Sequence, residues 1–401
     1  MKSEPCFIPS GGVTSPAGFK AGAAAARIKH TNQKRLDIGV IVSTTPCNAA
    51  AVFTTNKFKA APVLLDMKIL KSGKARAVVA NSGCANACTG AQGMADAFEM
   101  AELTASLTGL KPQDVLVAST GVIGVNLPME RIRKAIPKIK LSVPGGHDVA
   151  RAIMTTDTVP KEAAVKAGSF IIGGVSKGAG MIAPDMATLL CFLTTDADVE
   201  LSFLKAALRR AVDISFNMIS IDGDGSTNDT VAILANGKSG GAVIDKDSPR
   251  AALFQDALNK ICVFLARAHA RDGEGATRLI EVTVEGAASQ SDARIVARTI
   301  VSSSLVKTAV HGCDPNWGRV VAAAGRSGAA LDPDKVGLQI GGTILVKAGA
   351  PVAFDRAKVS KALGKKEVTI VLNLNLGRGK ATAWGCDLSA EYVKINAEYT
   401  T

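Results

Sequence analysis

Short runs of apolar, β-branched residues alternate along this chain with longer segments of helical periodicity. The short runs predict buried strands at Gly39–Ser43, Ala77–Ala80, Ser169–Gly174, Leu189–Thr195 and Val231–Ala235, with further strand character at Ile280–Glu285, Val336–Lys347 and Glu367–Asn375. Apolar residues recur at three- and four-residue spacing, which predicts helices, in Met94–Leu107, Met129–Lys138, Leu201–Val212, Ala251–Arg271 and Ala293–Leu305. Because strands and helices mix along the whole length, the sequence predicts a layered α/β (mixed α+β) fold.

Polar, glycine-rich patches interrupt these elements. Loops of this kind often carry binding and catalytic residues, although any one patch taken alone is more often an ordinary tight turn. The patches are Asn81–Gly90, Ser119–Gly124, Lys177–Thr188, Asp222–Thr230, His311–Arg319 and Asn396–Thr401. Their number in one chain favours a functional role for some of them.

The composition is that of a large globular protein. The chain has 401 residues, 47% of them hydrophobic, and a mean hydropathy of +0.21. A chain of this length predicts two to three domains or one large layered unit. No run of about 18 apolar residues occurs, so no membrane-spanning helix is expected. The 8 cysteines are scattered through a long chain, which favours reduced thiols. A cytoplasmic location is expected, although a mitochondrial matrix would suit reduced thiols equally.

The formal net charge of +12 raises the question of nucleic acid. Residues 1–187 carry 22 Lys and Arg against 12 Asp and Glu, whereas residues 188–401 carry 25 against 23. No dense basic cluster is interleaved with aromatic residues, which are only 4% of the chain, and a stacking platform for bases needs both. We therefore expect no nucleic-acid partner, and attraction of small anionic substrates is the favoured use of the surplus charge.

Several short motifs match known signatures but lack their context. Ser176 lies in a G-x-S-x-G pattern, yet Pro184 interrupts the helix that a nucleophile elbow needs. Ser304–Lys307 satisfies S-x-x-K without the accompanying motifs and is interpreted as the end of a helix. Cys84 and Cys88 have no second pair at metal spacing, so small buried thiols are favoured over zinc ligands.

Thr188 lies at the junction between a glycine- and proline-containing stretch and an apolar strand. The local pattern alone favours an ordinary β-forming threonine at the start of a strand. The alternative is a nucleophile that cleaves the Ala187–Thr188 bond and so frees its own α-amino group. That amine, with a reference pKa of about 7.7–8.0, would act as the general base for the threonine hydroxyl.

Blocks of sequence along nearly the entire chain carry a more specific signal. They are Gly11–Thr14, Asn81–Gly90, Ser119–Gly124, Met154–Thr158, Lys177–Thr188, Asp222–Thr230, Asp314–Arg319 and Ile395–Thr401. With these blocks in this order, the chain resembles the ornithine acetyltransferase (glutamate N-acetyltransferase) family of arginine biosynthesis. The resemblance implies a layered αββα sandwich of the self-processing type, with a smaller second domain.

The resemblance also implies a self-cleaving enzyme. Cleavage between Ala187 and Thr188 would leave an α chain, residues 1–187, and a β chain, residues 188–401, which stay together as one catalytic unit and assemble as a heterotetramer. An acetyl group would pass from N-acetylornithine to Thr188 and then to glutamate. No metal or organic cofactor is implied, and the use of acetyl-CoA as a second acetyl donor is left open.

Site residues follow from the same resemblance. Thr120 and Gly121 match the family's oxyanion pair, with the threonine hydroxyl and the glycine N–H as donors to the negatively charged oxygen of the intermediate. Taken alone, a Thr-Gly pair is more often a turn at the end of a strand. The residues expected to line the substrate site are Thr155, Lys177, Thr188, Glu274, Asn396 and Thr401. Lys177 suits a carboxylate and Glu274 suits an ammonium group.

One departure from the family pattern precedes the cleavage point, where Asp185 replaces the usual asparagine. Its negative charge would raise the pKa of the new amine, or the side chain would face water without effect. Two other functions remain as alternatives. One is an amidohydrolase or aminopeptidase with the same N-terminal threonine, in which water takes the acyl group. The other is a non-catalytic basic scaffold that binds anions.

Overall fold

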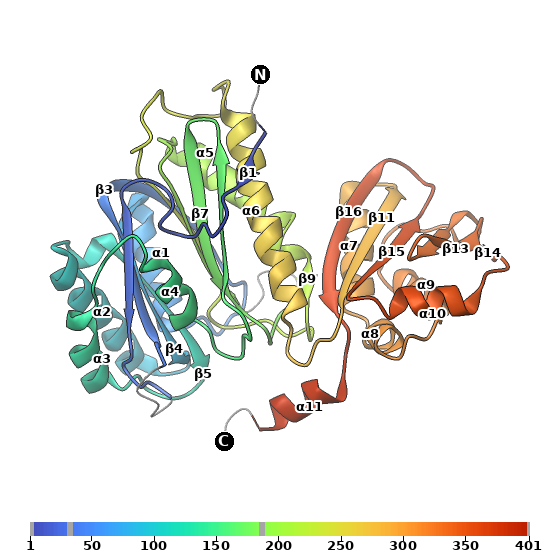
Figure 1. Ribbon diagram of the computed structural model, residues 1–401, viewed down its shortest axis with the longest axis horizontal. Coiled ribbons are helices and arrows are strands. Elements are labelled where there is room, and N and C mark those ends of the chain that lie inside the picture. Colours follow the sequence, from blue (N-terminus) through green and yellow to red (C-terminus); the bar gives the residue numbers. More distant parts are fainter. Residues whose placement is uncertain (1–3, 30–34, 184–188, 399–401) are drawn as a thin grey trace. The chain divides into compact units, whose positions relative to one another are not determined.

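The computed structural model describes residues 4–29, 35–183 and 189–398, which fall into two compact units (Figure 1). The first unit contains Met1–Gly178, Thr188–Asp213 and Gly225–Leu265, and the smaller second unit contains Ala179–Ala187, Ile214–Asp224 and Ala266–Thr401. A smaller second unit agrees with the expected second domain. Both units draw residues from either side of the Ala187–Thr188 bond, so the units do not coincide with the predicted α and β chains, whose boundary stays a prediction.

The first unit is built on one large mixed sheet. Its strands are β1 (Cys6–Phe7), β2 (Phe19–Ala24), β3 (Ile38–Phe53), β4 (Lys74–Cys84), β5 (Val115–Val122), β6 (Lys161–Ala167), β7 (Phe170–Lys177), β8 (Leu190–Thr195) and β10 (Thr230–Ala235). In the part of the chain that the structure describes, this nine-stranded sheet has the order β1-β6-β7-β8-β10-β3-β4-β5, and β2 pairs with β3.

Strand β3 joins the two halves of this sheet. Its first residues pair with β2 and β4, its last residues pair with β10, and its pairing with β4 is irregular between Val42 and Cys47. Strands β4 and β5 are parallel to each other, as are β8 and β10. Parallel neighbours end at the same edge of a sheet, so the polar residues that end β4 and β5 lie side by side.

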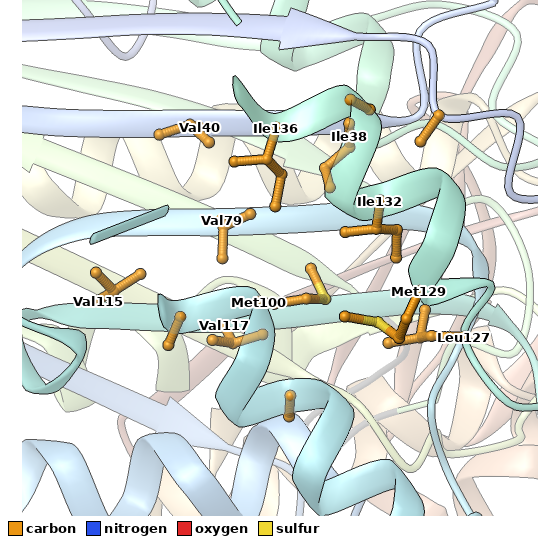
Figure 2. Close-up of a cluster of buried hydrophobic side chains, with 14 of the residues drawn as sticks. Ile38, Val40, Val79, Met100, Val115, Val117, Leu127, Met129, Ile132 and Ile136 are labelled. Atoms are coloured by element: carbon orange, nitrogen blue, oxygen red, sulfur yellow. The ribbon is translucent and has the colours of Figure 1, made fainter. Parts of the chain in front are cut away.

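One face of β3, β4 and β5 is covered by helices α1 (Ala61–Ile69), α2 (Gly90–Thr108) and α3 (Met129–Ala135). Alternate strand residues such as Val40, Val79 and Val117 point toward these helices, where they meet Met100 and Ile132 (Figure 2). All five are almost fully buried, and each such side chain contributes about 1.5–3 kcal/mol by leaving water. This core holds the β4–β5 edge rigid.

The opposite face of the same strands belongs to a second buried cluster. Ile41, Val78 and Leu116 occupy the intervening positions and share this cluster with Phe192 of β8 and with Val149 of helix α4 (Gly146–Ala152). Side chains from both halves of the sheet therefore meet in one interior. The period-two alternation of a strand is what sends neighbouring residues to the two cores.

A further helical layer packs on the other half of the sheet. It consists of α5 (Leu201–Asp213) and α6 (Ala251–Arg271). The first unit includes α6 only as far as Leu265. Phe254 of α6 lies against Phe170 of β7 and Phe203 of α5, with ring centroids 5.7 and 6.0 Å apart. Helices thus cover both halves of the sheet from outside, which confirms the predicted layered α/β fold.

The second unit has its own sheet with helices packed against it (Figure 1). Its strands are β9 (Ile219–Ser220), β11 (Leu279–Ala287), β12 (Gly337–Ile340), β13 (Thr343–Lys347), β14 (Ala350–Pro351), β15 (Glu367–Asn373) and β16 (Gly379–Cys386). Its remaining helices are α7 (Gln290–Val301), α8 (Ser304–His311), α9 (Gly318–Gly325), α10 (Arg356–Leu363) and α11 (Ala390–Ala397). Among the described residues the strand order is β14-β13-β12-β15-β11-β16-β9, and α7 packs across β11 and β16.

Short 3-10 turns complete the regular structure of the described residues. They are Leu70–Ser72, Pro112–Asp114, Ile136–Lys138, Phe216–Met218 and Pro333–Lys335.

Two predicted elements are wrong in detail. The helix expected at Ala293–Leu305 is two helices, α7 and α8, because Ser303 adopts an extended backbone (φ −74°, ψ 113°) between them. The Ser304–Lys307 motif therefore begins a helix instead of ending one. The strand region Val336–Lys347 is a hairpin, which turns at Gly341 and Gly342 with φ of 56° and 80°.

Two further expectations need correction. Cys84 is buried as expected, but Cys88 is exposed, because it lies in the loop between β4 and α2. The patches Asn81–Gly90 and Ser119–Gly124 were expected as connections between elements, yet their first residues complete β4 and β5. The polar character of these strand ends hid their regular structure from the sequence pattern.

No helix among the described residues is both long and apolar enough to cross a membrane.

Candidate active site

Six of the predicted site residues are described by the structure, and they divide between the two units. Thr120, Gly121, Thr155 and Lys177 belong to the first unit, whereas Glu274 and Asn396 belong to the second. The structure joins Thr155 to Lys177 and Glu274 to Asn396 by hydrogen bonds. The predicted cleavage and terminal residues, namely Ala187, Thr188 and Thr401, lie outside the described residues, as does Asp185.

Thr120 and Gly121 lie at the end of β5, beside the end of the parallel strand β4. Thr120 is only 5% exposed, and Gly121 stands opposite Gly83 in the strand register. Gly121 has a φ of 135°, and a Cβ at this position would lie 2.3 Å from the Gly83 carbonyl carbon. Only glycine fits here, because the backbone of β4 approaches Gly121 so closely.

A network of amide side chains holds these two strand ends. The Ser119 hydroxyl donates to the Asn81 side chain at 2.6 Å. The Asn228 side-chain amide donates to the carbonyl oxygens of Ser119 at 2.8 Å and of Ala85 at 2.6 Å. Because the Ser119 carbonyl belongs to the peptide group that precedes Thr120, Asn228 fixes the orientation of the proposed oxyanion residues.

Lys177 and Thr155 meet at the end of β7. The Lys177 Nζ donates to the Thr155 Oγ1 at 3.2 Å, and Lys177 is only 3% exposed. Asp157 anchors both residues, since its carboxylate accepts hydrogen bonds from the Thr155 N–H at 3.0 Å and from the Gly178 N–H at 2.7 Å. Lys161, also buried, donates to the same carboxylate at 2.6 Å.

The charges around Asp157 favour its ionised form. Burial alone would raise its pKa, but the positive charges of Lys161 and Lys177, with hydrogen bonds from Lys161 and Gly178, outweigh burial and lower the pKa well below its usual range. The Asp157 carboxylate at this end of β7 therefore lies near the buried ammonium groups of Lys161 and Lys177.

Leu189 is the first described residue after the predicted nucleophile, and its N–H donates to Asp229 at 3.0 Å. Asp229 is fully buried. Burial raises the pKa of Asp229 well above its usual range, and the Leu189 N–H and the Lys177 charge offset this only in part. The start of β8 is thus tied to the residue that precedes β10.

Within the second unit, Glu274 and Asn396 form a polar pair. The Asn396 side-chain amide of α11 donates to Glu274 at 2.8 Å, and the Glu274 N–H donates to the Ala179 carbonyl oxygen at 2.7 Å. A Cβ at Gly180 would lie 2.4 Å from the Glu274 carboxyl carbon. The segment that follows β7 therefore packs closely on Glu274, which is 8% exposed.

Asp222 holds the same segment from another side. Its carboxylate accepts hydrogen bonds from the N–H groups of Met181 at 2.5 Å and of Ile182 at 2.8 Å. Met181 has a φ of 55°, a left-handed conformation that is uncommon for a residue with a side chain. Burial and the nearby negative charge of Asp222 raise the pKa of Tyr392. These contacts fix the chain in the second unit shortly before the predicted cleavage point.

Sequence reasoning missed several of these residues. Asp157, Asn228 and Asp222 all lie in blocks that resemble the family, but no role was assigned to them. Lys161 carried no signal, because a lysine at the start of a strand is usually exposed. A buried polar residue is the recognisable feature that these residues share, and burial depends on contacts between distant segments. Within residues 4–29, 35–183 and 189–398, no group of three His, Cys, Asp or Glu side chains could hold a metal ion.

Comparison with known proteins gives matches along nearly the whole chain. The ArgJ family model matches residues 20–401. The arginine biosynthesis bifunctional protein ArgJ of Dehalococcoides mccartyi is 54% identical over 405 aligned positions, which cover 100% of both chains. The protein of that name from Symbiobacterium thermophilum is 53% identical, covering 98% of this chain and 99% of the relative.

A solved structure is also similar. The crystal structure of the arginine biosynthesis bifunctional protein from Bacillus halodurans is 43% identical with a TM-score of 0.51. It covers 52% of this chain and 98% of its own chain.

Proposed function

The chain belongs to the ArgJ family, and we propose from this membership and from the site geometry that it transfers an acetyl group from N-acetylornithine to glutamate. It is an enzyme of arginine biosynthesis, an ornithine acetyltransferase. The observation that carries the proposed reaction is the buried Lys177–Thr155 pair at the end of β7. This pair places a positive charge and a hydroxyl side by side, which suits the binding of a substrate carboxylate.

Self-cleavage between Ala187 and Thr188 is the first part of the proposal. The similar Bacillus halodurans chain is covered over 98% of its own length, yet it covers only 52% of these 401 residues, about 209. A cut before Thr188 would leave a β chain of 214 residues here, from Thr188 to Thr401. The two lengths, about 209 and 214 residues, nearly agree. This agreement supports the proposal that the Bacillus halodurans chain is one of two cleavage products.

The transfer is proposed to run in two steps. The Thr188 hydroxyl attacks the acetyl carbon of N-acetylornithine while its proton passes to the Thr188 α-amine. The C–N bond then breaks, the proton moves to the departing amine, and ornithine leaves an acetyl ester on the threonine. The glutamate amine attacks this ester in the second step, which releases N-acetylglutamate and restores Thr188.

Each remaining residue has a proposed role in these steps. The Thr120 hydroxyl and the Gly121 N–H donate to the negatively charged oxygen that forms in both steps. Lys177 and Thr155 are proposed to bind a substrate carboxylate. The ionised Asp157 holds the backbone at both residues, through the N–H groups of Thr155 and of Gly178, which follows the lysine. Roles in substrate binding are also proposed, on the resemblance, for Glu274, Asn396 and Thr401.

Product analysis tests the reaction. The purified enzyme is incubated with N-acetylornithine, with and without glutamate, and ornithine, acetate and N-acetylglutamate are measured by mass spectrometry. We expect ornithine and N-acetylglutamate in equal amounts and only when glutamate is present. Equal release of ornithine and acetate without glutamate would instead establish the alternative, an amidohydrolase with an N-terminal threonine.

The assembly, cofactor and location remain part of the proposal. We expect an α2β2 heterotetramer, which light scattering of the cleaved protein would measure. The reaction is proposed to need no metal or organic cofactor, so chelators should leave the rate unchanged. Acetyl-CoA in place of N-acetylornithine tests for a second donor. A cytoplasmic location is proposed because the free cysteines fit a reducing compartment.

A further inference from the structure

Thr155, one of the proposed substrate-binding residues, lies in an irregular loop. The described residues between the end of α4 at Ala152 and the start of β6 at Lys161 form no helix or strand. In such a loop, no ladder or helical turn fixes the directions of the peptide groups. A binding role for Thr155 needs its hydroxyl at a fixed place beside Lys177, so other groups must hold the loop.

Side chains hold the backbone of Thr155 from both sides. Its N–H donates to the Asp157 carboxylate at 3.0 Å. On the carbonyl side, the Arg35 Nη2 donates to the Thr155 oxygen at 3.0 Å and to the Met154 oxygen at 3.4 Å. Asp157 belongs to the same loop, whereas Arg35 comes from a segment 120 positions before Thr155. Arg35 therefore ties the loop to a distant part of the chain.

The backbone that carries Arg35 is itself anchored. Asp37, two residues later, is buried, and its carboxylate accepts hydrogen bonds from the N–H groups of Ala26 at 2.5 Å and Ile28 at 2.7 Å. The Asp37 carbonyl oxygen accepts the N–H of Ser82 on β4 at 2.9 Å. The Arg35 side chain therefore starts from a backbone that is tied to the sheet.

The arginine side chain is well suited to holding these carbonyl groups. A guanidinium group is planar and always charged, and its N–H donors have a rigid geometry. Hydrogen bonds from a charged donor are about twice as strong as those between neutral groups. With both its N–H and its carbonyl oxygen held, Thr155 has a fixed backbone, and its Cα–Cβ bond has a fixed direction. The Thr155 hydroxyl is thereby kept where the Lys177 Nζ donates to it at 3.2 Å.

We propose that Arg35 is a positioning residue for substrate binding. It holds the Thr155 backbone so that the Thr155 hydroxyl and the Lys177 ammonium group together meet the carboxylate of each amino-acid substrate. This role rests on the proposed function, in which these two groups bind that carboxylate. Because Arg35 acts through Thr155, its loss should weaken the binding of both substrates and leave the chemical steps unchanged.

Arg76 provides a matched control. Its Nη2 also donates to two successive carbonyl oxygens, those of Ser43 at 3.3 Å and Thr44 at 3.0 Å. Arg35 and Arg76 are both partly buried, and both belong to the first unit. The carbonyl groups that Arg76 holds lie on β3, which carries none of the proposed substrate-binding residues. A variant of Arg76 therefore loses the same kind of bonds without disturbing Thr155.

The test compares the wild-type enzyme with Arg35→Met and Arg76→Met. Methionine keeps an unbranched side chain but has no N–H donor. Initial rates of ornithine release give kcat and the KM of each substrate, with N-acetylornithine and glutamate varied in turn. We expect Arg35→Met to raise both KM values by about 5–30-fold, as for the loss of one or two hydrogen bonds. Its kcat should stay near the wild-type value, because binding alone is weakened.

Arg76→Met should keep both wild-type KM values. Unchanged KM values for Arg35→Met would overturn the inference, as would a fall in its kcat without a rise in KM. An equal rise of KM in Arg76→Met would also overturn it, because a general loosening of the first unit would then explain both variants. A wild-type protein that transfers no acetyl group would instead refute the proposed function itself.

A double variant separates positioning from direct contact with the substrate. Thr155→Ala removes the hydroxyl that Arg35 is proposed to position. Arg35→Met should therefore raise KM much less in the Thr155→Ala background than in the wild-type background. Equal rises in both backgrounds would overturn the positioning role. Wild-type KM values for Thr155→Ala alone would remove Thr155 from the substrate site, and this inference with it.

Circular dichroism shows whether Arg35→Met folds. If it does not, Arg35→Gln replaces it, because glutamine keeps a polar group at this partly buried position. The glutamine side chain is two bonds shorter than that of arginine and carries no charge, so it cannot hold both carbonyl oxygens. The same rise in both KM values is expected for Arg35→Gln, and wild-type KM values for this variant would overturn the inference.

Discussion

Replacing Gly121 with alanine tests how tightly the proposed oxyanion residues are built into the sheet. The added Cβ would lie 2.3 Å from the Gly83 carbonyl carbon and 2.5 Å from the Cys84 nitrogen. Both are backbone atoms of β4, so no flexible side chain can turn away. An ordinary contact begins at 3.4 Å, and β4 and β5 would have to separate by about 1 Å to reach it.

The cost has two parts. A residue with a side chain at a φ of 135° is strained by about 1–2 kcal/mol, and overpacking adds about 1–3 kcal/mol. We therefore expect Gly121→Ala to lower the free energy of unfolding by about 2–5 kcal/mol. We also expect kcat/KM to fall by about 10²-fold, because the site would be displaced by about 1 Å. Alanine keeps the backbone N–H, so this loss would not come from a missing donor.

Gly124→Ala, three positions further along the chain, is the matched control. Gly124 also has a positive φ, 80°, but a Cβ there would meet nothing within 4 Å. It should show the strain alone, about 1–2 kcal/mol, with near wild-type kcat/KM. Denaturant unfolding and the initial rate of ornithine release measure both effects. If the two variants matched each other in stability and in rate, the reasoning about the β4–β5 contact would be refuted.

Three further predictions concern the first unit. Thr120→Ala should lower kcat by about 10²–10³-fold if its hydroxyl stabilises the oxyanion, and an unchanged kcat would remove it from that role. Asn228→Ala should lower the free energy of unfolding by about 1–3 kcal/mol, because buried carbonyl oxygens lose their donor; urea unfolding checks this. The lowered pKa of Asp157 predicts an acid-sensitive stability: the unfolded chain, with an aspartate pKa of about 3.9, binds a proton before the folded protein does. The free energy of unfolding of the wild type should therefore be constant above about pH 5 and fall below it. The part of this fall that comes from Asp157 should be missing in Asp157→Asn. Denaturant unfolding of both proteins across this pH range measures the difference.

The long periodic elements were predictable from the sequence, because their burial repeats at a regular spacing. The predicted helix Ala251–Arg271 coincides with α6 at both ends, and the apolar runs at the centres of β7, β8 and β10 became strands. Strand β5 was missed, although it carries Thr120 and Gly121, because its polar end resembles a turn. Short helices such as α4 give too few turns for periodicity to show.

The candidate site was only partly predictable, for a physical reason. Resemblance located Lys177 and Thr155, and the structure joins them. The residues that hold the site in place act across long stretches of chain: Asn228 reaches Ser119, which lies 109 positions earlier. A side chain's polarity is visible in the sequence, but its burial and its partner follow from the fold.

The intact mass of the purified protein under denaturing conditions, with N-terminal sequencing of each fragment, tests the central claim most directly. We predict fragments of 187 and 214 residues, the second starting at Thr188, and a single uncut chain of 41.2 kDa for Thr188→Ala. A wild-type protein that transfers acetyl groups while remaining a single 41.2 kDa chain would contradict the claim that Thr188 becomes an N-terminal nucleophile.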